Sequence, residues 1–493
     1  MICELKRPGT IRAVCALAVF FFVFLGTEYL FDNCMASATD AEGIVRAQNY
    51  VLGISTIGFC MYGVLSKWLE RLSKGVLSGI LVAAGLILSG CMICIFLQES
   101  YAGMMAAGMV WFLMIGIIGS AIHFRLGYVL ENRRGLARMV GLSYALGIFL
   151  QFLNNNLVRT DLVETIVLLV FTLLLIGFLC IDKEKQETAE TESTASKDST
   201  QKNSVMSGVL MILTVFFLAF IFSTLDSVVT MVHAGGSVDI GQWPRLLLGA
   251  SGLLAGFLYD IKDRRFMHLI MYCIAVLSTS CIVVIAFGGP FLLVLFVFYI
   301  AAGFFSVYFT AGFLDLSYSM RKPKLWAGLG RAVNNASAVL ITLCFSSYFS
   351  HMHYGMILVA LVLFVIISIC MFVMQSFTKQ MRDLPFEMDA DCNGMTACTS
   401  MESAEDGRQG VRTDKLSAER KLELFVEQYA VTEREAEVLS ALLSSDANVQ
   451  DIAKDLGLSR AALYRHIANL NEKTNTKARI GLIQFYYEWV PEI

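Results

Sequence analysis

Apolar runs of membrane-spanning length alternate with short polar connections up to about residue 377. A helix needs about 20 predominantly apolar residues to cross the hydrocarbon core of a bilayer. The pattern therefore predicts twelve membrane helices, six on each side of a polar, low-complexity stretch at 182–205. Their expected centres lie near residues 21, 57, 87, 112, 147, 171, 218, 250, 277, 304, 338 and 364.

Beyond residue 377 the pattern changes to that of a soluble, helical segment, so the predicted fold class is all-α throughout. Leu422, Phe425 and Val426 have helical spacing and indicate a connecting or dimerising helix. The expected divisions are a first membrane half at 1–181, a flexible loop at 182–205, a second membrane half at 206–377, a tether at 378–415, a connecting helix at 416–430 and a compact head at 431–493.

Composition strengthens the membrane interpretation and argues against an enzyme. Hydrophobic residues make up 56% of the chain and charged residues only 16%, and the mean hydropathy is +0.65, too apolar for an ordinary soluble protein. The pair Cys91 and Cys94 lies inside an apolar run, where cysteine behaves as a small hydrophobic residue. We find no Walker loop, zinc motif or nucleophile constellation, and we expect no catalytic site, metal or cofactor.

Basic residues gather in every second connection, which predicts the orientation. By the positive-inside rule these connections and both termini are expected to be cytoplasmic. The alternate connections carry little beyond Arg46 and Arg159. The basic residues are Lys6, Arg7, Arg12, Lys67, Arg71, Lys74, Arg125, Arg133, Arg134, Arg138, Lys183, Lys185, Lys262, Arg264, Arg265, Arg321, Lys322 and Lys324.

The last sixty residues have the spacing of a helix-turn-helix. Thr432 and Glu435 stand three apart, as in a capping box that begins a helix. Gly457 allows a tight turn, and Ser459 can cap the next helix. That helix has an apolar face at Leu463, Ile467 and Leu470.

This stretch resembles the four-helix DNA-binding domain of LuxR/NarL-type regulators. The resemblance is carried by Thr432, Arg434, Glu435, Glu437, Val438, Leu439, Ile452, Ala453, Leu456, Leu458, Ser459, His466, Leu470, Lys473 and Arg479, with departures at Val449, Tyr464 and Thr474. It implies double-stranded DNA as partner and a homodimer formed through the head on two half-sites. The implied DNA contacts are Ser459, Arg460, Tyr464, Arg465, His466, Asn469 and Lys473, of which His466 and Lys473 would touch phosphate.

The first 377 residues resemble the major facilitator superfamily. Between the eighth and ninth predicted helices, Gly256, Asp260, Arg264 and Arg265 are similar to a loop signature of that superfamily, with Asp263 at the usual second glycine. The equivalent loop of the first half keeps Gly63, Leu65 and Arg71 but has Lys67 in place of the acid. The resemblance implies a twelve-helix architecture and supplies no substrate.

Ionisable residues inside predicted membrane helices are costly, which makes them candidate ligand-binding residues. Glu28 and Asp226 occupy equivalent helices of the two halves, and in the resembled fold both border a central cavity. Arg245 and Asn154 are expected at a similar depth. The alternative is that Arg245 forms a structural ion pair with one of the carboxylates. Asp315 and Arg331 are expected near the inner helix ends, and to hold cytoplasmic loops.

The function that these features favour is a membrane-embedded, one-component transcriptional regulator. Its transporter-like domain senses an unknown small molecule and controls sequence-specific DNA binding by the head. A secondary transporter that carries a regulatory head is the first alternative, and a head that binds only another protein is the second.

Overall fold

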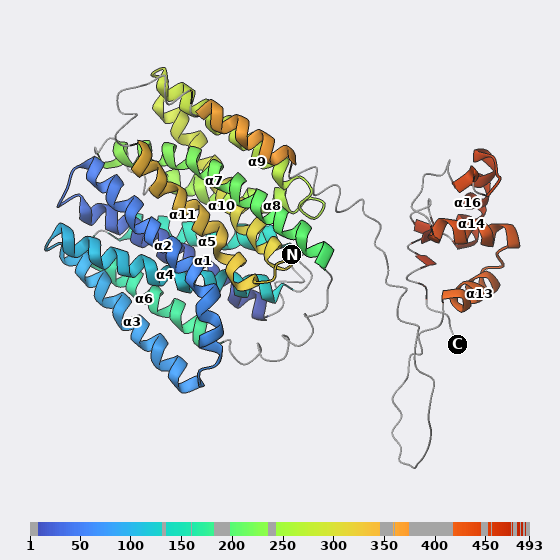
Figure 1. The fold of residues 1–493 in the computed structure, drawn as a ribbon, viewed down its shortest axis with the longest axis horizontal. Coiled ribbons are helices and arrows are strands. Elements are labelled where there is room, and N and C mark those ends of the chain that lie inside the picture. The colour runs from blue at the N-terminus through green and yellow to red at the C-terminus, as the bar shows by residue number, and fades with distance from the viewer. Residues whose placement is uncertain are drawn as a thin grey trace, which may run out of the picture. The chain divides into compact units, whose positions relative to one another are not determined.

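The structure is a computed structural model that divides into two compact units, Met1–Met388 and Asp389–Ile493. It describes residues 8–130, 135–158, 160–181, 198–234, 243–345, 358, 360–373, 418–444, 452–454, 456–474, 476, 481–483, 485–486 and 489. Each unit is described by itself below (Figure 1). The predicted tether at 378–415 lies outside the described residues.

The first unit is a bundle of long helices. They are α1 (Pro8–Met35), α2 (Ala41–Glu70), α3 (Lys74–Leu97), α4 (Tyr101–Val129), α5 (Leu136–Leu157), α6 (Asp161–Ile181), α7 (Asp198–Ala234), α8 (Trp243–Tyr259), α9 (Met267–Ala286), α10 (Phe291–Ser317) and α11 (Pro323–Phe345), followed by a shorter helix at Ala360–Val373. Every one of the twelve predicted centres falls inside one of these helices.

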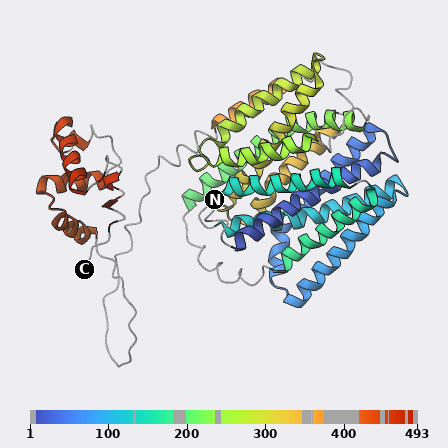
Figure 2. The same ribbon diagram turned by 180° about the vertical axis from the view of Figure 1, so that it is seen from behind.

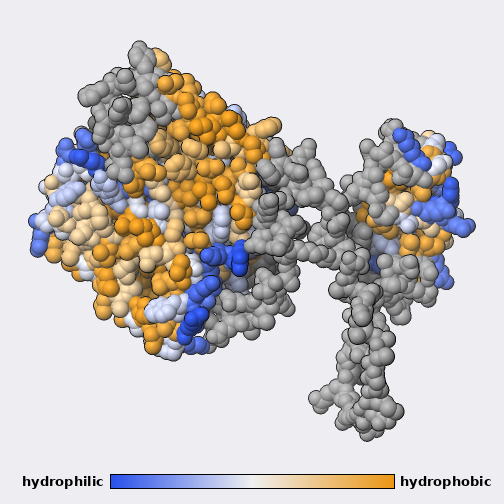
Figure 3. Space-filling model, viewed as in Figure 1, coloured by the Kyte–Doolittle hydropathy of each residue, from blue (hydrophilic) through white to orange (hydrophobic). Residues whose placement is uncertain are grey.

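Nine helices in the described part of the chain are long and apolar enough to cross a membrane. The other three are shorter or more polar: α8 has 17 residues, α11 carries Arg331, Asn334 and Asn335 at its middle, and the last helix spans only Ala360–Val373. Large apolar side chains cover much of the outer surface (Figure 3), among them the exposed Leu86, Leu292 and Phe372. The prediction of a multi-pass, all-α membrane domain is confirmed.

Polar side chains at several connections begin the next helix. Asp40, Ser73 and Ser100 accept hydrogen bonds from the backbone N–H groups of Gly43, Val76 and Gly103, at 3.0, 3.4 and 3.1 Å. One boundary differs from the prediction, because α7 begins at Asp198, inside the stretch 182–205 expected to be a loop. A helix satisfies its own backbone hydrogen bonds, so it can extend through polar residues beyond an apolar core. Residues 182–197 lie outside the described residues.

The two sets of six helices are structurally equivalent. α2 packs on α4 as α8 packs on α10, and α1 packs on α5 as α7 packs on α11. The halves meet along two seams, α5 against α8 and α2 against α11. The two seams are equivalent, because α8 and α11 of the second half correspond to α2 and α5 of the first half. Figures 1 and 2 show these helices side by side from opposite directions. An internal repeat of this kind is characteristic of transporter folds, and the predicted six-plus-six arrangement is confirmed.

Glycines let the helices of the first seam approach closely. A Cβ atom at Gly256 would lie 2.7 Å from the carbonyl oxygen of Ala137 and 3.1 Å from the Cα atom of Gly141. On the second seam, a Cβ atom at Gly63 would lie 2.7 Å from the Cβ atom of Leu325. The Gly residues of both loop motifs therefore mark the places where the two halves touch.

The second unit has its own hydrophobic core. It contains α13 (Ala418–Gln428), α14 (Glu433–Ser444), a helical turn at 452–454, α16 (Arg460–Thr474) and helical residues at 481–483 and 485–486. Leu463, Ile467 and Leu470 are buried on one face of α16, as predicted, and α16 packs on α14.

The predicted connecting helix is present as α13, and its apolar face is part of the core of the head. Phe425 is fully buried, and its ring centroid lies 5.1 Å from those of Tyr486 and Trp489 and 4.7 Å from that of Tyr429. This aromatic cluster joins the beginning of the head to its end.

We predict that Gly256→Ala destabilises the first unit, because the added methyl group forces α5 and α8 apart. Overpacking of this kind costs about 1–3 kcal/mol, which should lower the midpoint of heat denaturation of the full chain in detergent. Gly177→Ala on α6 is the control, since nothing lies within 4 Å of its Cβ position. Equal midpoints for the two variants would contradict the close packing of this seam.

Candidate ligand cavity and DNA-binding face

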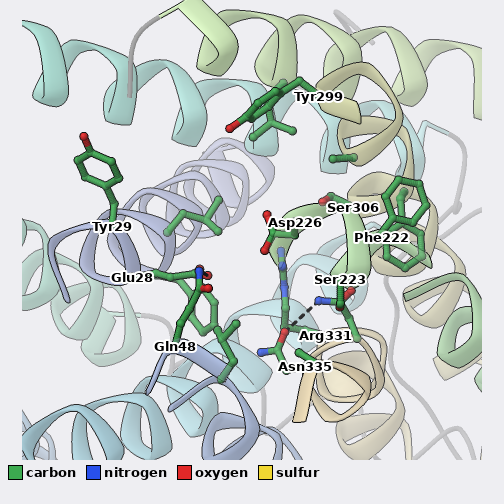
Figure 4. Close-up of a pocket in the computed structure, with 18 of the residues that line it drawn as sticks. Glu28, Tyr29, Gln48, Phe222, Ser223, Asp226, Tyr299, Ser306, Arg331 and Asn335 are labelled. Carbon is green, nitrogen blue, oxygen red and sulfur yellow. Dashed lines mark hydrogen bonds between the residues drawn. The ribbon is translucent and has the colours of Figure 1, made fainter. Parts of the chain in front are cut away.

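A cavity of about 170 Å³ lies between the two halves of the first unit. Helices α1, α2 and α5 of the first half and α7, α8, α10 and α11 of the second half line it. Figure 4 shows Glu28 and Gln48 on one side of this space and Asp226, Tyr299 and Arg331 around the rest of it. Five of the lining residues carry a carboxyl or a guanidinium group: Glu28, Asp32, Asp226, Arg245 and Arg331.

The acidic residues of the cavity come from both halves. Glu28 accepts a hydrogen bond of 3.0 Å from Nε2 of Gln48 on α2. Asp32 lies one helical turn further along α1, and its Oδ1 atom is buried without a hydrogen-bond partner among the described residues. Asp226 faces the same space from α7. Asp32 was not predicted, although its spacing of four from Glu28 places both carboxylates on one helix face.

Arg245 and Asn154, the other two predicted ligand-binding residues, have different positions. Arg245 lines the cavity, is 9% exposed and lies 5.7 Å from the ring centroid of Tyr29. Within the described part of the chain, no ion pair shorter than 4.0 Å joins Arg245 to Glu28 or Asp226, so the alternative of a direct structural pair does not hold here. Asn154 is not among the lining residues, and its side chain donates a 3.1 Å hydrogen bond to Glu164.

Arg331 is the functional candidate that the sequence placed wrongly. It was expected near the inner helix end, but it lines the cavity and is only 6% exposed. Its guanidinium carbon lies 4.9, 5.5 and 5.7 Å from the ring centroids of Phe309, Phe21 and Phe24, distances typical of cation–π contacts. Nε and Nη2 have no hydrogen-bond partner among the described residues. Position 331 is eight residues into α11, which carries it about 12 Å along the helix axis.

The loop motif closes one end of the bundle, which we call the motif end: α2, α4, α8 and α10 finish there, and α5 and α11 begin there. Asp260 accepts hydrogen bonds from the backbone N–H groups of Ala137 and Arg138 at 3.3 and 2.8 Å, and so caps α5 from the other half. Arg138 and Arg264 also pair with Asp260, at 3.2 and 3.5 Å. The buried carboxylate therefore holds the first seam together.

Arg264 extends this network to α10 through a 3.0 Å ion pair with Asp315, so Asp315 does lie near a helix end as predicted. Arg265 is exposed. Asp263, at the position where the signature usually has glycine, has a φ of 53°. This left-handed conformation favours glycine, and aspartate tolerates it better than most residues.

The equivalent position of the first half has a different chemistry. Lys67 replaces the capping acid, and the nearby contact between the halves is an ion pair of Glu70 on α2 with Lys324 on α11. At the same end, the Tyr318 hydroxyl on α10 donates to the carbonyl oxygen of Gly127 and lies 3.3 Å from that of Leu130, where α4 finishes. The motif end is thus bridged between the halves at several points.

The head begins with the predicted capping box. The N–H of Thr432 donates to Glu435 at 3.0 Å, and the N–H of Glu435 lies 3.4 Å from the Thr432 hydroxyl. Burial would raise the pKa of the Glu435 carboxyl, but hydrogen bonds from Lys473, Thr432 and Asn469 outweigh it and lower the pKa from 4.5 to about 2. Gly457 has a φ of 62°, as the predicted tight turn requires.

Three of the candidate DNA-contacting residues, Tyr464, Arg465 and Asn469, lie on the side of α16 away from the core. Ser459 caps the helix by accepting from the N–H of Ala462 at 3.2 Å. Tyr464 is 48% exposed, and Arg465 and Asn469 are exposed as well. His466 is half-buried, and its Nδ1 atom has no hydrogen-bond partner among the described residues. α16 begins at Arg460, whose side chain lies outside the described part of the structure.

Lys473, which was expected to contact a DNA phosphate, forms contacts within the head. Its ammonium donates to Glu435 at 2.6 Å and to the carbonyl oxygen of Ala430 at 2.8 Å. Lys473 therefore ties the end of α16 to the beginning of α14. A spacing of 38 residues between partners leaves no sequence signal from which this pair could have been predicted.

Comparison with known proteins agrees with this description. Residues 430–486 match the family of bacterial regulatory proteins, luxR family, so the head is a luxR-type DNA-binding domain. The chain is similar to an auto-inhibited peptide transporter of the POT family, at 13% identity and a TM-score of 0.49 over 76% of this chain and 97% of that chain. It is also similar to FucP, a transporter of the Major Facilitator Superfamily in the outward conformation, at 12% identity and a TM-score of 0.49 over 75% of this chain and 98% of that chain. No curated protein sequence matches the chain significantly.

We predict that Glu435→Gln lowers the free energy of unfolding of the head at neutral pH by about 1–3 kcal/mol. Because the folded pKa is depressed, the carboxylate contributes stability that is present above pH 4.5 and is lost as the pH falls toward 2. Urea denaturation of residues 389–493 at several pH values measures both effects. The variant should lose less stability than the parent between pH 4.5 and 2, and parallel curves would contradict this role of Glu435.

Proposed function

We propose that the protein is a membrane-embedded, one-component transcriptional regulator. Its membrane domain binds a small molecule in the cavity between the halves, and this binding controls sequence-specific DNA binding by the head. The observation that carries the proposal is the presence, in one chain, of a luxR-type domain at 430–486 and a membrane cavity lined by five ionisable side chains. Ionisable residues inside a membrane domain are costly and are typically retained for function.

The orientation follows from the distribution of basic residues. The basic residues at or near the motif end include Lys67, Arg71, Arg125 and Arg138. By the positive-inside rule, that end and both chain termini would lie in the bacterial cytoplasm. The head then has access to DNA. The cavity, which Glu28 and Asp32 line from the last two turns of α1, lies nearer the outer face.

The cavity and the motif end are coupled by shared helices. α8 and α10 contribute Arg245 and Tyr299 to the cavity, and their other ends lie beside Asp260, which bonds α5 of the first half, and Asp315, which pairs with Arg264. A ligand shifts a conformational equilibrium only by its difference in affinity for the two states. A ligand that draws the two halves together around the cavity would therefore alter the contacts between the halves at the motif end.

The head would read DNA with the exposed side of α16. Arg460, Tyr464, Arg465 and Asn469 would approach base edges in the major groove, with Ser459 and His466 near the backbone. Lys473 has a supporting role, because its ammonium is already bound within the head. As with other helix-turn-helix proteins, we expect two copies on two half-sites.

We predict that Arg465→Gln weakens DNA binding by about tenfold or more, because it removes a charged group from the reading face of α16. The measurement is a salt titration of the full chain on promoters whose transcripts change when the gene is deleted. Arg434→Gln is the matched control, since Arg434 lies on α14 and pairs with Glu437. If the two variants bind equally and transcription is unchanged in both, the head does not act by DNA binding, and protein binding alone becomes the better interpretation.

A secondary transporter that carries a regulatory head is the second candidate. It is favoured by the position of the cavity between two equivalent halves that contact each other at the motif end. The replacement of the capping acid by Lys67 in one half favours the regulator, because only one of the two seams keeps the buried carboxylate.

We predict that Glu28→Gln and Asp226→Asn alter transcription of the target promoters without changing the metabolites that cells take up or release. In a regulator, these variants change ligand recognition, and the signal to the head changes with it. Promoter activity and medium composition, measured in the same cultures, separate the two functions. Loss of uptake or export with unchanged transcription would favour the transporter.

A further inference from the structure

We propose that the cavity binds a small zwitterion of about the size of an amino acid, with an ammonium group at one end and a carboxylate at the other. The inference rests on the proposed function, because it takes the cavity to be the ligand site of the sensor. It names the ligand class from the volume and from the acidic and basic groups that line the same cavity.

The volume limits the ligand to a small metabolite. About 170 Å³ holds roughly six waters at about 30 Å³ each. Drug-sized ligands occupy pockets of about 300–1,000 Å³. This volume suits a single amino acid, or a molecule of that size, better than a peptide or a sugar of several units.

The acidic side of the cavity suits an ammonium group. Glu28 and Asp32 lie one turn apart on α1, and Asp226 faces the same space from α7. Gln48 donates to Glu28, but the buried Oδ1 atom of Asp32 has no partner among the described residues. An ammonium group has three N–H donors and no acceptor. It would satisfy carboxylate oxygens that the protein leaves without hydrogen bonds.

Arg331 offers a partner for the carboxylate of the ligand. Its side chain is 94% buried, and within the described residues neither Nε nor Nη2 has an acceptor. The rings of Phe21, Phe24 and Phe309 stabilise its positive charge but do not replace the two strong acceptors that a guanidinium fork prefers. A buried donor without a partner is costly. A ligand carboxylate would satisfy both N–H groups at once.

The presence of both kinds of charged group favours a ligand that carries both charges over a simple anion or a simple cation. Three carboxylates and two guanidinium groups line the cavity, so an anion alone meets an excess of negative charge. A cation alone leaves the N–H groups of Arg331 buried without an acceptor. The guanidinium carbon of Arg245 lies 5.7 Å from the ring centroid of Tyr29, and Tyr299, Phe298 and Phe222 offer apolar surface for the body of the ligand. A zwitterion satisfies all of these groups together.

Matched probes test the class directly on the full chain in lipid nanodiscs. Each proteinogenic amino acid is compared with the amine that lacks its carboxylate and the acid that lacks its ammonium group; for phenylalanine these are phenethylamine and 3-phenylpropionate. A ligand that binds only the folded state raises the midpoint of heat denaturation as its concentration rises. We expect at least one amino acid to bind at least about tenfold more tightly than both of its matched probes. The proposal is overturned if no amino acid stabilises the protein, or if an amine or acid does so equally well.

Variants assign the two ends of the ligand. Asp226→Asn should reduce the affinity for the amino acid at least about tenfold, and Arg331→Gln should reduce it to the level of the matched amine. Glu164→Gln is the control, because Glu164 is a buried carboxylate that bonds Asn154 outside the cavity. An equal loss in the control variant would mean that the effect is one of folding, and would overturn the assignment of the ends. The probe series on the unaltered chain stands even if Arg331→Gln does not fold.

Failure of the ligand class and failure of the proposed function give different results. If no zwitterion binds but deletion of residues 1–377 still changes promoter activity, the regulator stands and the ligand belongs to another class. If zwitterions bind and promoter activity is the same with and without them, the cavity serves something other than transcription.

Discussion

Five ionisable side chains around one small cavity are the constraint on which the membrane domain depends. An unpaired charge inside an apolar bundle costs several kcal/mol, and the two halves share this cost between them. α1 carries two of the carboxylates, and α7, α8 and α11 of the other half carry the third carboxylate and both guanidinium groups. Opposite charges thus attract across the cavity without forming direct pairs. That attraction favours a closed interface, yet leaves each group able to bind something else.

The contacts at the motif end of the two seams show which interactions hold the halves together there. Both seams bring helices close at glycines, but only one has a buried carboxylate that caps the helix of the other half. Breaking the Asp260 contacts exposes two backbone donors and leaves Arg264 and Arg138 with one partner fewer. The other seam has the Glu70–Lys324 pair, in which the Glu70 side chain is 44% exposed. A pair of that kind contributes less, because water can replace each partner. Separating α5 from α8 therefore costs more free energy than separating α2 from α11.

Much of this architecture could be predicted because its signals are local. Apolar runs located all twelve helices, and Thr432, Gly457 and Ser459 marked the helix boundaries of the head through short-range hydrogen bonds and a single dihedral angle. Long-range partners left no such signal. The expected depth of Asn154 suggested a ligand-binding role, but its side chain bonds Glu164 on the next helix. The charge of Lys473 suggested a phosphate contact, but its ammonium bonds Glu435 within the head. Arg331 was placed wrongly because a count of residues from a basic loop does not show where a helix begins. Asp32 could have been found, since its spacing from Glu28 is itself local.

The self-contained core of the head limits how a membrane signal could reach it. α13 is the first described element after the membrane unit, and Phe425 fixes it to Tyr486 and Trp489 at the far end of the head. The capping box and the Lys473 contact hold α14 to α16 independently of anything outside. A head that is already folded does not need the membrane domain in order to form its reading face. In the proposed function, control therefore acts on where the head can reach and on whether two heads meet on DNA, rather than on the fold of α16.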